Sequence, residues 1–311
     1  MIVETQPART VAVEACPACQ SRDYAEAGRA PALICHLGER DFVQPDYVVR
    51  ECSACGLIYR TPNLSPEELG AYYALVDYRK WEVPGFFPTE RAIHQRLRLR
   101  PSRARILDFG CSSGRLLAPL VADHDCCGFE INAEAARIAA TKGLSMIAPT
   151  EFVSGGCGLF DAIVMSDVFE HLSAPVELLC KLIGLLNPGG ELLIVTGNAD
   201  APACRLDPAQ FWYFRNVEHL CMLTRRHAEF IARELGLTLE VWHELSHYDT
   251  PLRERLFQSA RHFAFWQFRH RTLLSKMLLP LVPMLNRAPS WPVAPAYTAS
   301  ADHVHAVFQK K

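Results

Sequence analysis

The segment 106–117 has the residue types and spacing of a ligand-binding loop. Its first residues, 106–109, predict a buried strand, and Gly110 and Gly114 follow in a turn before an expected helix. Glycines let the backbone approach a ligand closely, and the N-terminus of a helix presents unpaired N–H groups. The segment therefore predicts a site of the kind found in many nucleotide-binding proteins.

The positions of the glycines indicate which kind of loop this is. A dinucleotide-binding loop has glycine at its first, third and sixth positions, and here these are Gly110, Ser112 and Arg115. The spacing from Asp108 to Gly114 instead resembles motif I of class I S-adenosylmethionine-dependent methyltransferases, which usually have glycine in place of Ser112. The resemblance implies that the cofactor is held by Asp108, Gly110, Cys111, Ser112 and Gly114.

Three later segments match the same family in the same order. Residues 126–130 predict a second strand that ends in Glu130, roughly 20 residues past the loop, where a ribose-binding carboxylate is expected. Segments 160–172 and 186–196 resemble the fourth strand and the turn with the fifth strand. The resemblance adds Glu130, Ile131, Ser166 and Asp167 to the expected cofactor site.

Two Glu-His pairs are candidates for proton transfer. His171 follows the expected fourth strand, and Glu218 and His219 follow the fifth. Ligands of open α/β sheets bind beyond the carboxyl ends of the strands, and histidine titrates near neutral pH. We expect His219, supported by Glu218, to act as general base ahead of His171. The alternatives are that His171 only shapes the pocket and that His219 only ties down its loop.

The N-terminal cysteines, the core and the late Glu-His pair together resemble bacterial sugar C-methyltransferases. Those enzymes act on nucleotide-linked keto-sugars, and the resemblance assigns Glu218 and His219 to proton abstraction. The family has a catalytic tyrosine two positions before the glutamate, where this chain has Asn216. O- or N-methylation of a sugar, a polysaccharide precursor or another secondary metabolite therefore stays open.

Two Cys-x-x-Cys motifs predict a metal site near the N-terminus. Cys16, Cys19, Cys52 and Cys55 provide four thiolates, which can enclose one tetrahedral ion and leave no position for substrate. We expect structural zinc, with iron as the rival because it accepts the same ligands. Cys35 and His36 are competing ligands that the two complete motifs make unnecessary.

The expected elements give an α/β fold with two modules. Residues 1–62 form a small zinc-ribbon module, 63–100 a helical linker or lid, and 101–311 the methyltransferase domain. Alternating strands and helices predict a Rossmann-like sheet of seven strands with helices on both faces, as in the family that the motifs resemble. The last strand, 303–308, is expected to be antiparallel, and 250–300 is a helical insertion.

Composition sets the wider context. The chain has 311 residues and a net charge of −2, so no basic character points to nucleic acid. The N-terminus lacks the pattern of a secretion signal, and the many cysteines suit a reducing compartment, so we expect a cytoplasmic enzyme with a small-molecule acceptor. The basic, aromatic segment 251–295 is a candidate lid, homodimer surface or peripheral membrane contact.

Two rival functions come from other classes. One is an RNA-modifying methyltransferase that holds nucleic acid with the ribbon, although segment 16–60 has five arginines against six acids. The other is a non-catalytic assembly protein, against which the intact Asp108, Gly110, Gly114 and Glu130 argue.

Overall fold

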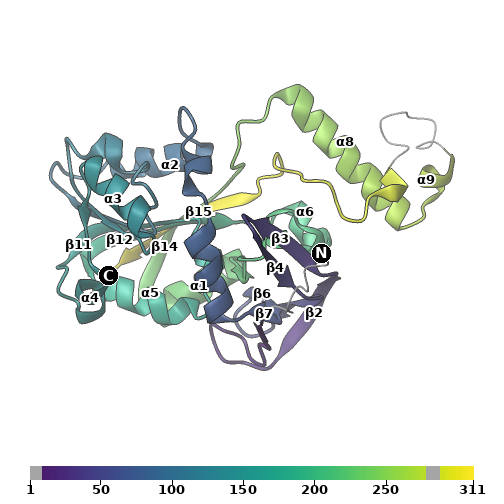
Figure 1. Ribbon diagram of the computed structural model, residues 1–311, viewed down its shortest axis with the longest axis horizontal. Coiled ribbons are helices and arrows are strands. Elements are labelled where there is room, and N and C mark those ends of the chain that lie inside the picture. Colours follow the sequence, from purple (N-terminus) through teal and green to yellow (C-terminus); the bar gives the residue numbers. More distant parts are fainter. Residues whose placement is uncertain (1–8, 278–287) are drawn as a thin grey trace.

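A seven-stranded sheet forms the centre of the molecule. The computed structural model describes residues 9–277 and 288–311 (Figure 1). The strands run in the order β10-β9-β8-β11-β12-β15-β14, and only β15 is antiparallel to its neighbours. Their bounds are β8 (Arg105–Phe109), β9 (Asp125–Phe129), β10 (Ser145–Met146), β11 (Phe160–Ser166), β12 (Leu186–Gly197), β14 (Leu237–Leu245) and β15 (His303–Lys310). The predicted Rossmann-like sheet is confirmed.

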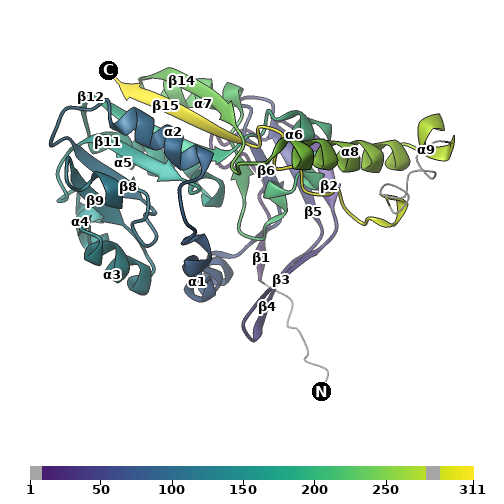
Figure 2. The ribbon, with the colours of Figure 1, turned by 90° about the horizontal axis from the view of Figure 1, so that it is seen from above.

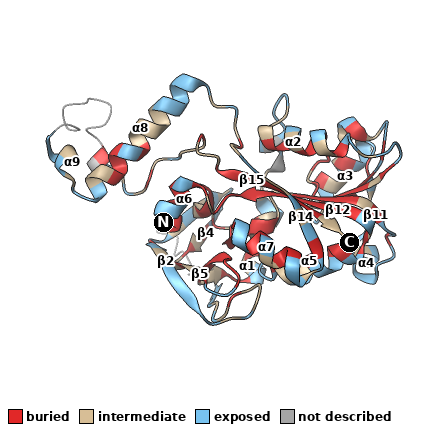
Figure 3. Cartoon of the chain, turned by 180° about the vertical axis from the view of Figure 1, so that it is seen from behind, coloured by how far each residue is buried: buried red, intermediate tan, exposed pale blue. Residues whose placement is uncertain are grey.

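Helices cover both faces of this sheet because its central strands are apolar on both sides. Leu107 and Ile163 pack into one hydrophobic cluster, whereas their neighbours Ile106 and Ala162 pack into another on the opposite face. One face carries α2 (Pro88–Leu97) and α3 (Ala133–Thr141), and the other carries α4 (Pro149–Ser154), α5 (Pro175–Gly184) and α7 (Arg225–Glu234) (Figures 1 and 3). The carboxyl ends of the parallel strands thus meet at one edge between the two layers.

The helix expected directly after Gly114 is not formed. The chain makes successive turns there, with a single 3-10 helix at Ala118–Leu120. Pro119 has no N–H group to continue an α-helical ladder, and its ring disfavours the helical conformation of Ala118. The loop therefore has turn N–H groups in place of a regular helix N-terminus.

The N-terminal strands form a second, smaller sheet. Its order is β13-β6-β5-β2, formed by β2 (Tyr24–Ala30), β5 (Tyr47–Cys52), β6 (Ile58–Thr61) and β13 (Cys221–Met222). A hairpin of β3 (Leu33–Leu37) and β4 (Arg40–Gln44) extends beside it, and β1 (Thr10–Val11) pairs with β7 (Asn63–Leu64) (Figure 2). Because β13 belongs to the later part of the chain, the N-terminal strands and the methyltransferase core share one sheet.

Two helical segments complete the chain. The linker has α1 (Pro66–Leu75), whose N-cap Ser65 accepts a hydrogen bond from the Glu68 backbone, and a 3-10 helix at Tyr78–Trp81. The short α6 (Pro202–Leu206) follows β12.

The segment 250–300 includes α8 (Leu252–Arg269), which extends away from the body, and α9 (Leu273–Met277) (Figure 1). Residues 278–287 of the insertion lie outside the described residues. No helix in the described ranges is both long and apolar enough to cross a membrane. The expected roles of the insertion stay predictions.

Arg60 joins the small sheet to the loop that follows β12. Its side chain is fully buried, and its guanidinium donates to the carbonyl oxygens of Asn216, at 2.7 Å, and Val217. Burial lowers the pKa of Arg60 to about 10, so the group stays charged at neutral pH. A buried charge needs such partners, and here the partners are backbone atoms of the loop that carries His219.

Replacing Arg60 by methionine tests this connection. We expect Arg60→Met to lower the free energy of unfolding by about 2–6 kcal/mol, because two buried carbonyls lose donors worth about 1–3 kcal/mol each. Arg29→Met is the control, since Arg29 is exposed and bonds only Glu26 among the described contacts. Urea denaturation measures both. A loss below about 1 kcal/mol for Arg60→Met would mean that the loop is held by other contacts.

Candidate active site

The glycines of the loop after β8 are required by its backbone conformation and by close packing. Gly110 has φ +82°, and an added Cβ would lie 2.6 Å from the Val168 side chain. Gly114 has φ +75°, and its Cβ would lie 2.9 Å from Ala139. Ser112 also adopts a positive φ, 49°, which explains why glycine is usual at this position in the resembling family.

Two acids lie at the ends of the neighbouring strands. Glu130 follows β9 and accepts backbone hydrogen bonds from Ser112 and Asn132, each at 2.8 Å. Asp108 is buried in β8, and burial, followed by the charges of Glu130 and Glu90, raises its pKa to about 7. The structure thus brings the predicted ribose-binding carboxylate to the motif I loop.

The remaining residues of the expected cofactor site lie around these two acids. Cys111 is buried beneath the loop, and Ile131 is 68% exposed beyond the end of β9. Ser166 ends β11, with its hydroxyl 3.4 Å from Asp167.

The linker residues 82–90 lie against the motif I loop. Arg115 donates to Glu90 at 2.7 Å and to the carbonyl of Gly85 at 2.6 Å. Glu82 accepts hydrogen bonds from Ser113 and, at 2.9 Å, from Lys142. These contacts hold linker residues 82–90 against the motif I loop.

Asp167, which is partly exposed, and buried His303 form an ion pair where β11 ends and β15 begins. His303 Nε2 lies 3.3 Å from Asp167 Oδ1, and His303 Nδ1 lies 3.1 Å from Asp302 Oδ1. Burial opposes the charge on His303, but the two carboxylates raise its pKa to about 10. Asp167 adopts φ 52°, a rare backbone conformation for a residue with a side chain, and such outliers cluster at functional sites.

Glu170, His171 and His219 form a second cluster beside this pair. Their ligand atoms all lie within 4.8 Å of one another. The single hydroxyl of Tyr213 lies within hydrogen-bond distance of both carboxylates, Asp167 at 3.0 Å and Glu170, and Thr196 donates to Glu170 at 2.7 Å. The two clusters are therefore joined through Tyr213.

His219 is held as a neutral ring. Burial lowers its pKa well below the ordinary value. Its Nδ1 lies 2.6 Å from the carbonyl oxygen of Tyr213, which can only accept, so Nδ1 carries the proton and Nε2 keeps a lone pair. A neutral imidazole with one nitrogen tied down and the other basic is the form that a general base requires.

The support expected from Glu218 is not found among the described contacts. Glu218 offers its backbone carbonyl to His171 Nδ1 at 3.2 Å, while its carboxylate raises the pKa of Tyr73, after burial, from the linker side. The carboxylate grouped with His219 is that of Glu170. Glu218 and His219 are neighbours in sequence, but their side chains diverge. Glu170, some fifty positions earlier, takes the place beside His219 that was expected for Glu218.

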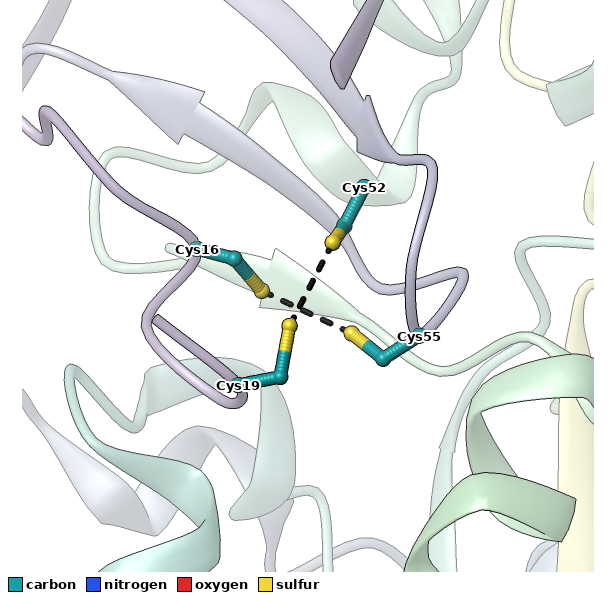
Figure 4. A group of neighbouring side chains, drawn as sticks. All are labelled: Cys16, Cys19, Cys52 and Cys55. Carbon is teal, nitrogen blue, oxygen red and sulfur yellow. Dashed lines mark hydrogen bonds between the residues drawn. The ribbon is translucent and has the colours of Figure 1, made fainter. Parts of the chain in front are cut away.

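The four cysteines of the two Cys-x-x-Cys motifs, which we call knuckles, converge on one point (Figure 4). Cys16 Sγ lies 3.5 Å from Cys55 Sγ, and Cys19 Sγ lies 3.5 Å from Cys52 Sγ. Four ligands at about 2.3 Å from one tetrahedral ion stand ~3.8 Å apart, so these separations suit a metal. Cys35 and His36 are not in this group, and His36 instead pairs with Asp41 at 2.6 Å.

A hollow of about 330 Å³ lies elsewhere, lined by residues that include Ser102, Asp161 and Gly189. These residues lie at the amino ends of β8 and β11, opposite the edge where ligands of open α/β sheets bind. The hollow is therefore not part of the candidate site.

Comparison with known proteins agrees with this geometry. Residues 87–241 match the model of a family described as a methyltransferase domain. This segment holds the glycine loop, Glu130 and both candidate histidines. The chain is a class I S-adenosylmethionine-dependent methyltransferase.

The methyltransferase is similar to two curated relatives called ubiquinone biosynthesis O-methyltransferase. The protein of Pectobacterium atrosepticum is 26% identical over 215 residues, which are 63% of this chain and 84% of that protein. The protein of Caulobacter sp. strain K31 is 31% identical over 115 residues, 33% of this chain and 44% of that protein. A TehB-like methyltransferase structure from Corynebacterium glutamicum has a TM-score of 0.42 at 19% identity, covering 79% of this chain and 100% of that one.

Several residues of the methyltransferase site carried no sequence signal. Glu170 was noted only as part of a Glu-His pair, and His247, Asp302 and His303 had no recognisable motif. Tyr213 is one of four consecutive aromatic residues, 211–214, and nothing in the sequence singles it out. A polar residue at the start of an otherwise apolar strand, as in 302–308, was the one available hint.

Asp108 predicts an unusual dependence of stability on pH. A carboxyl whose folded pKa is raised from 3.8 to about 7 binds its proton more tightly in the folded state. Stability is therefore lost as pH rises from about 4 to 7. We expect Asp108→Asn to remove this loss, which amounts to at most about 4 kcal/mol at about 1.4 kcal/mol per pKa unit. Unfolding free energies of both proteins across this pH range provide the measurement, and parallel curves would contradict the shifted pKa.

Proposed function

We propose that the enzyme methylates an oxygen atom of a small-molecule acceptor, with His219 as general base. The observation that carries this proposal is the fixed, neutral imidazole of His219 with its free Nε2 at the carboxyl edge of the sheet. The relatives named O-methyltransferases support the choice of oxygen. The acceptors that we consider are nucleotide-linked sugars, polysaccharide precursors and other secondary metabolites with a hydroxyl group.

The cofactor would be held by the loop and strand ends described above. Gly110 and Gly114 allow the tight turn of the loop beside Glu130, whose carboxylate would accept hydrogen bonds from ribose hydroxyls. S-adenosylmethionine supplies an electrophilic methyl group when bound. We assign Asp108, Cys111, Ser112, Ile131, Ser166 and Asp167 to the surroundings of the same cofactor.

The residues after β12 would handle the proton. His219 Nε2 takes the hydroxyl proton of the acceptor, and the buried carboxyl of Glu170 lies close enough to stabilise the imidazolium that forms. Tyr213 and Thr196 hold Glu170 in place through their hydroxyl groups. His171 packs edge-on to His219, with ring centroids 4.8 Å apart, and we assign it to shaping the site.

Aromatic rings surround the polar groups. The ring of Trp212 lies 5.5 Å from Tyr213 and 6.5 Å from Tyr248, and Phe87 of the linker lies 5.6 Å from Tyr248. Such rings favour a planar or ring-shaped acceptor. Asn216 donates its amide to the Tyr213 carbonyl at 3.1 Å, so it serves the loop in the place where sugar C-methyltransferases have a catalytic tyrosine.

We also propose that the four cysteines hold one structural zinc ion. The sulfur separations support a closed four-thiolate site. The charges of the module support the expectation that it does not bind nucleic acid, because Arg29 and Arg40 pair with Glu26 and Glu68, and Arg60 is buried. A cytoplasmic location remains our expectation from the cysteine content.

The base is tested by replacing His219. Losing a positioned base should lower single-turnover rates by about 10²–10⁴. The affinity for S-adenosylmethionine should change little, because His219 belongs to the acceptor side. In the pH–rate profile of the wild-type enzyme, the apparent pKa of the acid limb should lie below ~6.5, the ordinary pKa of histidine, because burial lowers the pKa of His219.

The acceptor is first sought by release of S-adenosylhomocysteine with protocatechuate and with UDP-glucose, which represent the phenol and sugar classes. Rates of His219→Ala and His171→Ala are then compared on the acceptor that reacts. A rate that collapses in His171→Ala and persists in His219→Ala would reverse the two assignments. A carbon-methylated product would contradict O-methylation.

The zinc assignment is tested by elemental analysis. Purified protein should contain about one zinc per chain. Cys52→Ser should reduce the zinc content to near zero and lower the midpoint of thermal unfolding, because an open site binds poorly and the knuckle loses its anchor. Cys180→Ser is the matched control, since Cys180 is exposed on α5 and outside the cluster. Unchanged zinc content in Cys52→Ser would refute the assignment, and iron in place of zinc would correct it.

A further inference from the structure

His247 and His303, which the proposed mechanism does not use, form a cluster with Asp167. Each offers one ligand atom, and these atoms all lie within 4.8 Å of one another. The residues come from the end of β11, the segment after β14 and the start of β15. We propose that this cluster is a divalent metal site that binds the acceptor oxygen.

The first support is the geometry of the ligand atoms. Asp167 Oδ1 and His303 Nε2 are 3.3 Å apart, which is the separation of two ligands placed ~2.1 Å from one ion at an angle of roughly 105°. His303 Nε2 belongs to a side chain that is 1% exposed, and its contact with Asp167 does not meet the geometry of a regular hydrogen bond. A shared ion between the two atoms would satisfy both of them.

The second support is the outer shell. His303 Nδ1 lies 3.1 Å from Asp302 Oδ1, the carboxylate–histidine arrangement that fixes the tautomer of metal-binding imidazoles. The same oxygen accepts the backbone N–H of His247 at 2.9 Å. Tyr213 orients Asp167 through a hydrogen bond of 3.0 Å. Each proposed ligand is thus positioned by a contact outside the site.

The donor set suits a cation. Asp167 and Asp302 bring two carboxyl groups to His303, and Asp302 is fully buried. Two imidazoles and one carboxylate suit a first-row divalent ion and leave coordination positions open.

The position of the cluster indicates a role for the ion. Asp167 follows β11 directly, at the edge where the methyl group is delivered, and Trp212 lies 6.5 Å from His303. The acceptor hydroxyl would bind at an open coordination position of the ion. The ion would lower the pKa of this hydroxyl, so that His219 receives the proton more easily. This role rests on the proposed O-methylation, whereas binding of the ion does not.

Mn²⁺ is the probe because it prefers oxygen and nitrogen ligands to the four thiolates. Electron paramagnetic resonance of zinc-loaded protein should show one bound Mn²⁺ per chain without any acceptor. His247→Ala should weaken binding by more than about 100-fold, and Asp302→Asn by about 10–100-fold, as for outer-shell partners. His243→Ala is the control, since His243 is exposed on β14.

Folding of each variant is checked by thermal melting and by binding of S-adenosylmethionine. Failure of that binding in the wild type would refute the proposed function and leave the metal result unaffected. No Mn²⁺ binding at millimolar concentration would overturn the metal site and leave an Asp167–His303 ion pair. Binding that is lost in His171→Ala and kept in His247→Ala would also overturn it, because the ion would then lie at Glu170, His171 and His219.

Discussion

The buried guanidinium of Arg60 is the constraint on which the acceptor side of the site depends. A charge without access to water must find donors or acceptors in the fold, and Arg60 finds the carbonyls of Asn216 and Val217. With that turn fixed, the Asn216 amide and His219 Nδ1 both bond the carbonyl of Tyr213. The orientation of the candidate base therefore follows from a residue of β6 that lies some 150 positions earlier in the chain.

The cysteine site acts on the same segment from the other side. The first turn of α7 binds the second knuckle, since Thr224 donates to the Gly56 carbonyl at 2.9 Å and His227 Nδ1 lies 3.3 Å from the Cys55 carbonyl. A side chain at Gly56 would collide with Arg226, so the contact is close. Between His219 and α7 lies β13, which pairs with β6. The cysteine cluster and β6 thus contact the segment that follows the candidate base His219.

Hydrophobic periodicity, glycine positions and cysteine spacing were the sequence features that allowed predictions. The seven-stranded sheet, its antiparallel last strand and the grouping of the four cysteines were anticipated from these features and from the family resemblance. The partner of His219 was not, because Glu218 and Glu170 look alike in sequence and only the turn at 217–218 decides which carboxylate faces the ring. The meeting of Asp167 with His303 spans 136 positions and depends on insertion of the antiparallel β15. The helix that the family pattern predicts after Gly114 does not form, because Pro119 interrupts it.

Tyr213 explains how two carboxylates so close together can take different roles. Its hydroxyl has one proton and faces both Asp167 and Glu170. Burial and the two negative charges raise the pKa of Tyr213 well above its ordinary value, so the proton stays on the phenol. Asp167 has a cationic partner in His303, which holds its pKa low despite burial, whereas burial raises the pKa of Glu170. Glu170 therefore has the greater need for the Tyr213 proton. The arrangement leaves Asp167 as the fixed anion that faces a cation, and Glu170 as the buried carboxyl that can respond when His219 gains charge.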